Sequence, residues 1–197
     1  MQEKKAVGSY GVIAVGLLVV LVLGWFVLSY NTLVKKEEQV KVSWAQVESN
    51  LQRKLELLPN LVKVVQKYAE HEKELLTEIT ELRANALKTL AHNSANNMAE
   101  VQKMQTRLDG TMMRLMAVAE NYPELKSSEQ FLQLQSQIEG TENRINITRM
   151  QFNAAVGDYN AYRKSIPANI ISSIGGFSQK AYFKADTEAH QKFKVEM

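Results

Sequence analysis

The sequence predicts an all-α protein, in which a single N-terminal transmembrane helix is followed by an antiparallel up-and-down four-helix bundle with long helices. Three observations lead to this prediction. No residue between Ala6 and Val34 carries a charge. The rest of the chain is rich in Leu, Lys, Glu, Gln and Ala and has little Gly or Pro to form turns. Its apolar residues recur at steps of three and four, which is the period of one helix face.

The first element is the apolar stretch Tyr10–Tyr30, which is nearly continuous Val, Leu, Ile and Gly. As a helix it spans about 31 Å, close to the hydrocarbon thickness of a bilayer. Two preceding lysines would also suit a cleaved signal peptide, but the run is long and residues 28–31 offer no small-x-small cleavage site. We therefore predict a short tail over 1–9 and a retained transmembrane helix over 10–30. Because lysines flank both ends, the positive-inside rule separates the two orientations only weakly, with a lean toward a cytoplasmic bundle.

The clearest element of the bundle is a helix predicted over 128–166, where apolar and small residues follow a heptad pattern for five repeats. Ser127 with Gln130 fits a capping box at its start, and Pro167 ends it. So long a seam also favours a coiled-coil contact with a second copy, and hence a homo-oligomer. The seam consists of Phe131, Leu134, Ile138, Thr141, Ile145, Thr148, Phe152, Ala155, Tyr159, Tyr162 and Ile166.

Three shorter apolar faces precede this helix, and together the four faces predict a bundle over 31–166. The first two faces are separated by Pro59, which either turns the chain sharply or kinks one long helix. We expect the turn, because the segments on either side match in length and can pack face to face. Residues 91–97 are predicted to form a loop, and Tyr122-Pro123 ends the third face. The faces consist of Val40, Trp44, Val47, Leu51, Leu55 and Leu58; of Leu61, Val65, Tyr68, Leu75, Ile79, Leu82, Ala86 and Leu90; and of Val101, Met104, Leu108, Met112, Leu115 and Val118.

The C-terminal tail, 167–197, is predicted to be partly helical or irregular. Aromatic residues alternate in it with lysines, a mixture that suits a lipid interface. We expect the tail to return to the membrane surface, and the alternative is that its aromatic rings cover the open end of the bundle. The residues concerned are Phe177, Tyr182, Phe183 and Phe193, with Lys180, Lys184, Lys192 and Lys194.

Composition excludes several classes of function. The net charge of +3 is spread along the chain without a basic block, so nucleic-acid binding is not expected. The absence of cysteine removes disulfides, thiolate metal sites and cysteine nucleophiles. No Gly-rich loop follows a predicted strand, so nucleotide binding has no support.

The sequence also lacks a recognisable metal site. His71-Glu72 begins like a zinc-protease motif, but Leu75 stands where the second histidine is required. The Glu-x-x-His pairs of diiron bundles are missing as well. We therefore expect no catalytic residue, metal or cofactor. The alternative is a hydrolase or metal-dependent enzyme with an unrecognised site near His71-Glu72.

Five polar residues share one side of the predicted last helix, and we call them the polar stripe. They are Glu142, Asn146, Arg149, Asn153 and Asn160. One interpretation is an interhelical hydrogen-bond network with Arg53, Glu120 or His71-Glu72, because buried polar groups fix the register of helices when they are paired. The other interpretation is a docking groove for another protein.

Taken together, several short motifs resemble the LemA family. They are Tyr30-Asn31-Thr32-Leu33-Val34, Leu58-Pro59-Asn60-Leu61-Val62, Tyr68-Ala69-Glu70-His71-Glu72, Glu120-Asn121-Tyr122-Pro123-Glu124-Leu125-Lys126, Thr141-Glu142-Asn143-Arg144-Ile145 and Tyr159-Asn160. The resemblance covers essentially the whole chain after the apolar helix, although Phe152-Asn153 stands where the family usually has Tyr-Asn.

The resemblance implies a single-pass helical bundle of the bacterial inner membrane with no catalytic residue. It further implies association with the cell envelope and its stress responses, with envelope zinc metalloproteases of the HtpX type and, in one branch, with magnetosome membranes. A scaffold or adaptor that self-associates and binds other envelope proteins is the function that we expect.

Overall fold

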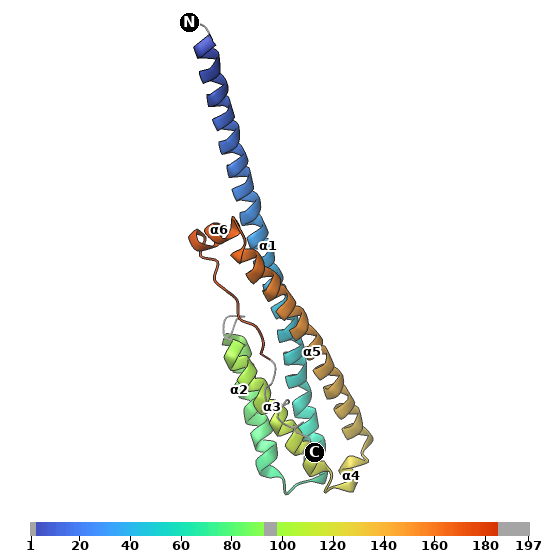
Figure 1. The fold of residues 1–197 in the computed structure, drawn as a ribbon. Helices are drawn as coiled ribbons and strands as arrows, with labels where there is room; N and C mark the ends of the chain where they lie inside the picture. The colour runs from blue at the N-terminus through green and yellow to red at the C-terminus, as the bar shows by residue number, and fades with distance from the viewer. Residues whose placement is uncertain (1–2, 93–97, 185–197) are drawn as a thin grey trace, which may run out of the picture. The chain divides into compact units, whose positions relative to one another are not determined.

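A computed structural model describes the backbone of residues 3–92 and 98–184, and the side chains of residues 13–91 and 98–184. The described residues form helices and short connections and contain no strand, which confirms the all-α prediction. The helices are α1 (Glu3–Tyr68), α2 (Lys73–His92), α3 (Met98–Ala119), α4 (Pro123–Lys126), α5 (Glu129–Lys164) and α6 (Ala168–Ile174), as labelled in Figure 1. The described residues thus contain two short helices, α4 between α3 and α5 and α6 after α5, which the predicted four-helix count lacked.

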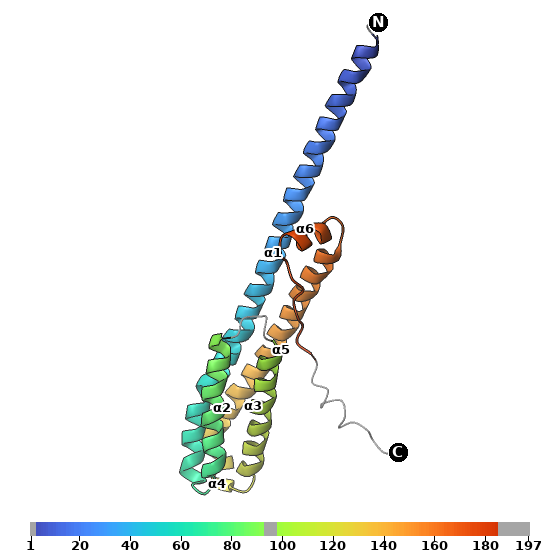
Figure 2. The ribbon, with the colours of Figure 1, turned by 90° about the vertical axis from the view of Figure 1, so that its left-hand side faces the viewer.

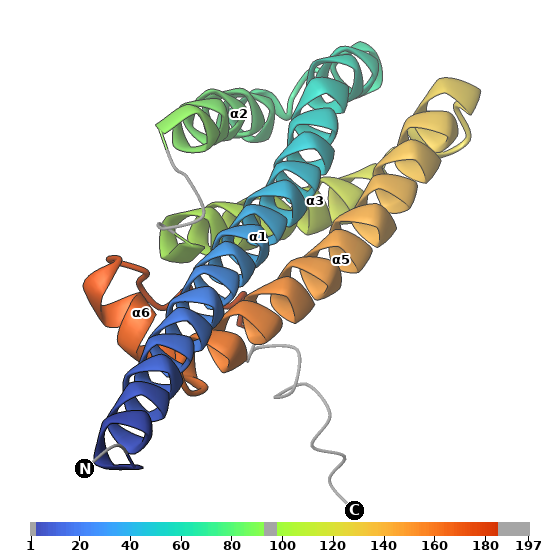
Figure 3. The same cartoon turned by 90° about the horizontal axis from the view of Figure 1, so that it is seen from above.

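The chain divides into two compact units, which are described separately. Unit 1 contains residues 1–40 and 155–180, and unit 2 contains residues 41–154 and 181–197. In unit 1, α6 lies to one side of α1 (Figure 3), beside its middle part, and the N-terminal turns of α1 extend past α6 (Figure 1). In unit 2, α2 and α3 form an antiparallel hairpin (Figure 2).

The apolar part of α1 matches the predicted anchor. Every side chain from Ile13 to Leu28 is exposed to solvent in the protein alone. Within the described residues, α1 from Ile13 onward is the one helix long and apolar enough to cross a membrane. A continuous apolar surface of this length is expected to be covered by lipid.

The expected turn at Pro59 is wrong, because α1 continues through this residue to Tyr68. A proline cannot donate the hydrogen bond to the carbonyl four residues earlier, which here belongs to Leu55. The Nε of Arg83 on α2 donates to this carbonyl instead, at 3.0 Å. Leu58 and Leu61 are also fully buried on either side of the proline, so packing favours an unbroken helix. The chain turns at residues 69–72 before α2 begins.

The long helix predicted over 128–166 is confirmed as α5, to within two residues at each end. The capping box at its start is wrong, because the Ser127 hydroxyl donates to the carbonyl oxygen of Pro123 in α4, at 2.9 Å. Ala91 and His92, placed in the predicted loop, belong to α2. The rest of that loop, residues 93–97, lies outside the described residues.

The core of unit 2 consists of the apolar faces that the periodicity identified. Its buried members include Val47, Leu51, Leu55, Leu58, Leu61 and Val65 from α1, Leu75 and Ile79 from α2, Val101, Leu108 and Leu115 from α3, and Phe131, Ile138, Ile145 and Phe152 from α5.

Candidate functional site

The candidate site is formed by α5 and the extended segment that follows α6, visible in Figure 1. We call residues 177–184 the C-terminal strap. Its first half, 177–180, belongs to unit 1 and its second half, 181–184, belongs to unit 2. The strap has no helical hydrogen bonds of its own, so its main-chain groups need partners elsewhere.

In unit 1, the side chain of Asn160 binds the main chain of the strap at one residue. Its amide nitrogen donates to the carbonyl of Lys180 at 2.9 Å, and its amide oxygen accepts from the Lys180 N–H at 3.0 Å. One turn later, Arg163 donates to the carbonyl of Phe177 at 2.6 Å. Asn160 is only 5% exposed, so this pairing satisfies a buried amide as well as the strap.

The side chains of the first half of the strap are also held in unit 1. The Phe177 ring meets Tyr30 edge to face, with centroids 5.7 Å apart. The Lys180 ammonium lies 2.8 Å from a carboxylate oxygen of Glu37. Since Tyr30 ends the predicted transmembrane segment, the strap begins beside the residues where α1 is expected to leave the lipid.

Tyr159 adds a titratable contact to unit 1, because its hydroxyl donates to the carbonyl of Ser178 at 2.9 Å. Burial is the main cause that raises the pKa of Tyr159 above its usual value of 10.0, and the nearby Glu37 carboxylate raises it further. The Arg163 guanidinium opposes this shift. The folded state therefore keeps this proton to a higher pH than the unfolded chain does.

The stability of the wild-type protein is expected to fall as the pH rises above about 10, by up to roughly 1.4 kcal/mol per pH unit. Below that pH the hydroxyl is protonated in both states and its contribution is intact. Urea unfolding of the wild type and of Tyr159→Phe at about pH 9 and about pH 11 measures the difference. If the two proteins lose stability in parallel, Tyr159 is not the group responsible.

In unit 2, Asn153 binds the main chain of the strap as Asn160 does in unit 1. Its amide nitrogen donates to the carbonyl of Phe183 at 3.1 Å, and its amide oxygen accepts from the Phe183 N–H at 2.9 Å. The next carbonyl, that of Lys184, accepts from Gln102 on α3 at 2.8 Å and from Arg149 on α5 at 3.3 Å.

The Phe183 side chain is buried in an aromatic cluster of unit 2. It stacks on Trp44 with centroids 6.0 Å apart and meets Phe152 edge to face at 5.5 Å. The Arg149 guanidinium lies 4.9 Å from the centre of the Phe183 ring. Because Phe183 is only 4% exposed, the expectation that residue 183 returns to the lipid headgroups is wrong. Protein covers this ring, in agreement with the alternative interpretation. Tyr182 is exposed, and Lys192, Phe193 and Lys194 lie outside the described residues.

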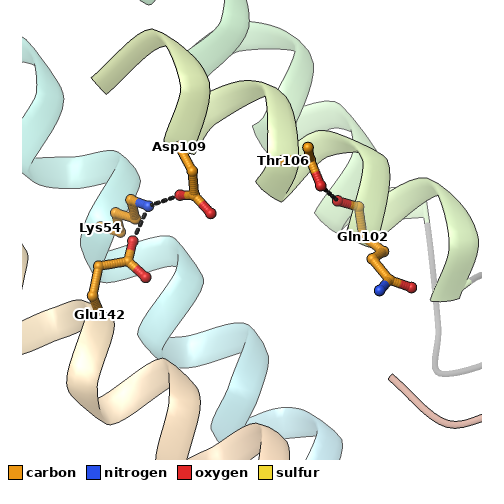
Figure 4. A network of polar contacts seen from close by, with 5 residues as sticks. All are labelled: Lys54, Gln102, Thr106, Asp109 and Glu142. Carbon is orange, nitrogen blue, oxygen red and sulfur yellow. Dashed lines mark hydrogen bonds and ion pairs between the residues drawn. The ribbon is translucent and has the colours of Figure 1, made fainter. Parts of the chain in front are cut away.

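An ion triad around the buried Lys54 forms a second polar feature of unit 2. Figure 4 shows Lys54 on α1 between Asp109 on α3 and Glu142 on α5. The Lys54 side chain is 4% exposed, and its ammonium lies 2.6 Å from the Asp109 carboxylate and also contacts the Glu142 carboxylate. A buried ammonium requires such partners.

The predicted polar residues therefore have other partners than those expected. Of the stripe, Arg149, Asn153 and Asn160 bind the strap, Glu142 joins the ion triad, and Asn146 is exposed. Glu72 accepts a hydrogen bond of 3.2 Å from the Tyr122 hydroxyl, and Glu120 pairs with Lys126. Arg53 and His71 are exposed.

Sequence reasoning missed Lys54 and the binding of the strap to α5. A signal for Lys54 was available, because it lies three residues after Leu51 and four before Leu58, on the same buried side of α1. The alternation of aromatic residues and lysines drew attention to the strap, but nothing in the sequence indicates that Asn153 and Asn160 bind its main-chain atoms. Within the described part of the chain, no group of three or more His, Asp or Glu residues is placed to hold a metal ion.

Within the described residues, the fold and site define an all-α protein with one helix able to span a membrane and a bundle in which α5 binds an extended segment through side-chain amides. Residues 43–197 match the LemA family, and the chain belongs to that family. Its sequence is similar to magnetosome protein MamQ 2 and magnetosome protein MamQ 1 of Paramagnetospirillum magneticum, each 26% identical over 188 residues, covering 85% of this chain and 69% of the relative. Magnetosome protein MamQ of Magnetospirillum gryphiswaldense is 24% identical over 176 residues, covering 79% of this chain and 65% of the relative.

Proposed function

We propose that the protein is a membrane-anchored, non-enzymatic scaffold of the bacterial cell envelope that self-associates and binds extended segments of other envelope proteins. The observation that carries this proposal is the asparagine clamp of unit 2, in which Asn153 pairs with both main-chain groups of Phe183. A clamp of this kind forms hydrogen bonds with main-chain groups, so it can bind an extended segment of another protein as well as the strap.

Selectivity comes from the aromatic cluster around the clamp. Trp44 and Phe152 receive the Phe183 ring, and Arg149 lies over its face. A partner segment therefore needs an aromatic side chain at the clamped residue and an extended main chain on both sides of it. The strap of a second copy meets both requirements, so exchange of straps between copies is the route to self-association.

Membrane attachment favours this exchange because it confines the copies to two dimensions and raises their effective concentration. The similarity to magnetosome proteins supports a bacterial membrane as the location, and the inner membrane with a cytoplasmic bundle is the arrangement that we propose. An envelope zinc metalloprotease of the HtpX type is a proposed partner, to be tested as a source of clamped segments.

Binding of an extended segment to the surface of α5 that holds the strap, here called the groove, is tested with full-length variants and a labelled peptide of residues 177–184. Phe183→Ala weakens the protein's own strap and leaves the groove intact, so it is expected to bind the peptide at least about tenfold more tightly than the wild type. The matched control, Phe183→Ala with Asn153→Leu, loses the clamp and is expected to return to weak binding. Fluorescence anisotropy measures both. A folded Phe183→Ala variant that binds no peptide contradicts the proposal.

Self-association has its own measurement. Two differently tagged copies, expressed together in one membrane at native levels, are expected to co-purify and to give cross-linked dimers or larger species. Monomers alone after cross-linking, with particles of monomer mass in detergent, contradict it.

A further inference from the structure

Unit 2 contains an open cleft of about 490 Å³ between α3 and α5, with Lys54 of α1 also lining it. One wall is formed by Met112, Met113 and Met116 of α3, and the other includes Ile138 of α5. The Met113 side chain is 64% exposed, although it is large and apolar. Flexible methionine side chains of this kind adapt to an apolar side chain that enters between them.

The charged residues of the cleft favour a cationic occupant. Asp109, Glu139 and Glu142 contribute three carboxylates, and Lys54 contributes one ammonium. The ammonium already pairs with two of the carboxylates, which leaves Glu139 as an exposed acid at the cleft. An apolar side chain flanked by lysines would match both the methionines and the excess negative charge.

The strap is directed toward this cleft. Its Lys184 carbonyl is bound by Gln102 on α3 and Arg149 on α5. Asp109 lies seven residues after Gln102, and Glu142 lies seven residues before Arg149, so the cleft begins two helical turns, about 10 Å, farther along the same two helices. From Phe183 to Lys184 the strap moves from Asn153 to Arg149, which is the direction of the cleft.

The residues that follow the strap have the required composition and reach. Phe193 stands between Lys192 and Lys194, nine residues after Lys184. Nine residues cover about 14 Å as a helix and about 30 Å when extended. Met113 lies eleven residues after Gln102 on α3, about 16 Å along the helix, which is inside this range.

We propose that the segment 185–197 of the same chain docks in this cleft, with Phe193 between the methionines and Lys192 and Lys194 beside the carboxylates. The cleft is thus a second binding site for the C-terminal part of the chain, and it lies farther along α3 toward α4 than the strap does. The proposal does not depend on whether the clamp binds other proteins, because it concerns the chain's own terminal segment.

The test places a photoreactive aromatic residue, p-benzoylphenylalanine, at position 193 of the full-length protein in vesicles. After irradiation and mapping by mass spectrometry, adducts within one chain are expected on Met112, Met113 or Met116. Met150 is the matched control, since it is 65% exposed on α5 but does not line the cleft. Equal yields on Met113 and Met150, adducts mainly on lipid, or adducts mainly on a second copy would each overturn the proposal.

A charge variant provides the second measurement. Glu139→Lys is expected to lower the yield of Met113 adducts by about threefold, because it reverses the charge that the terminal lysines meet. Glu129→Lys, an equivalent change at an exposed residue of α5 outside the cleft, is expected to leave the yield unchanged. Equal yields in the two variants would overturn the assignment of the lysines to the carboxylates.

Discussion

Phe152→Ala is expected to lower the free energy of unfolding by about 3–5 kcal/mol, the range for removal of a buried aromatic ring. Phe152 has no exposed surface, and its ring contacts both Trp44 and Phe183 at centroid distances of 5.8 Å and 5.5 Å. The substitution leaves a cavity between α5 and Trp44 and removes the edge-to-face contact with the Phe183 ring. Urea unfolding of the full chain in detergent, followed by helical circular dichroism, measures the loss.

Met150→Ala is the matched control for Phe152→Ala. It lies two residues earlier on α5 and is 65% exposed, so its effect is expected to stay within about 0.5 kcal/mol. A loss below about 1 kcal/mol for Phe152→Ala would show that the aromatic cluster does not stabilise the bundle.

Lys54→Ala is expected to destabilise unit 2 by about 2–3 kcal/mol, because it leaves the Asp109 and Glu142 carboxylates facing each other without a cation. The loss falls below that of a fully buried pair, since the two carboxylate side chains are 41% and 32% exposed and water screens them. Thermal unfolding of the full chain measures it.

A triple variant separates the role of the charges from that of packing. Lys54→Met with Asp109→Leu and Glu142→Met replaces the triad by apolar side chains of similar size, and its stability is expected to equal or exceed that of the wild type. If the triple variant is as unstable as Lys54→Ala, the loss of stability comes from altered packing and not from the unpaired carboxylates.

The sequence predicted the elements whose signal is local. The heptad pattern of α5 repeats within one stretch of chain, so its period identified the helix and most of its buried face. The last predicted seam residue, Ile166, is wrong, because α5 ends at Lys164 and Ile166 is 78% exposed. The course of α1 could not be predicted in the same way. Pro59 weakens the helix locally, and the compensating donor, Arg83, stands on a different helix. Only the tertiary structure brings the two together.

The candidate site shows the same division. Periodicity placed Arg149, Asn153 and Asn160 on one side of a helix, and their proximity along α5 follows from that alone. The partners of these three side chains are main-chain atoms of Phe183, Lys184 and Lys180. These partners could not be predicted, because every residue has the same main-chain atoms. Main-chain recognition of this kind is visible only once both segments are placed.

The bond between Arg83 and the Leu55 carbonyl has a further consequence for how this part of the protein folds. Until α2 docks, the Leu55 carbonyl that Pro59 cannot satisfy has water as its partner, and its bond to Arg83 forms only when α2 packs against α1. The stretch of α1 around Pro59 and helix α2 therefore gain their full stability together, and they should open and exchange their amide protons as one cooperative segment.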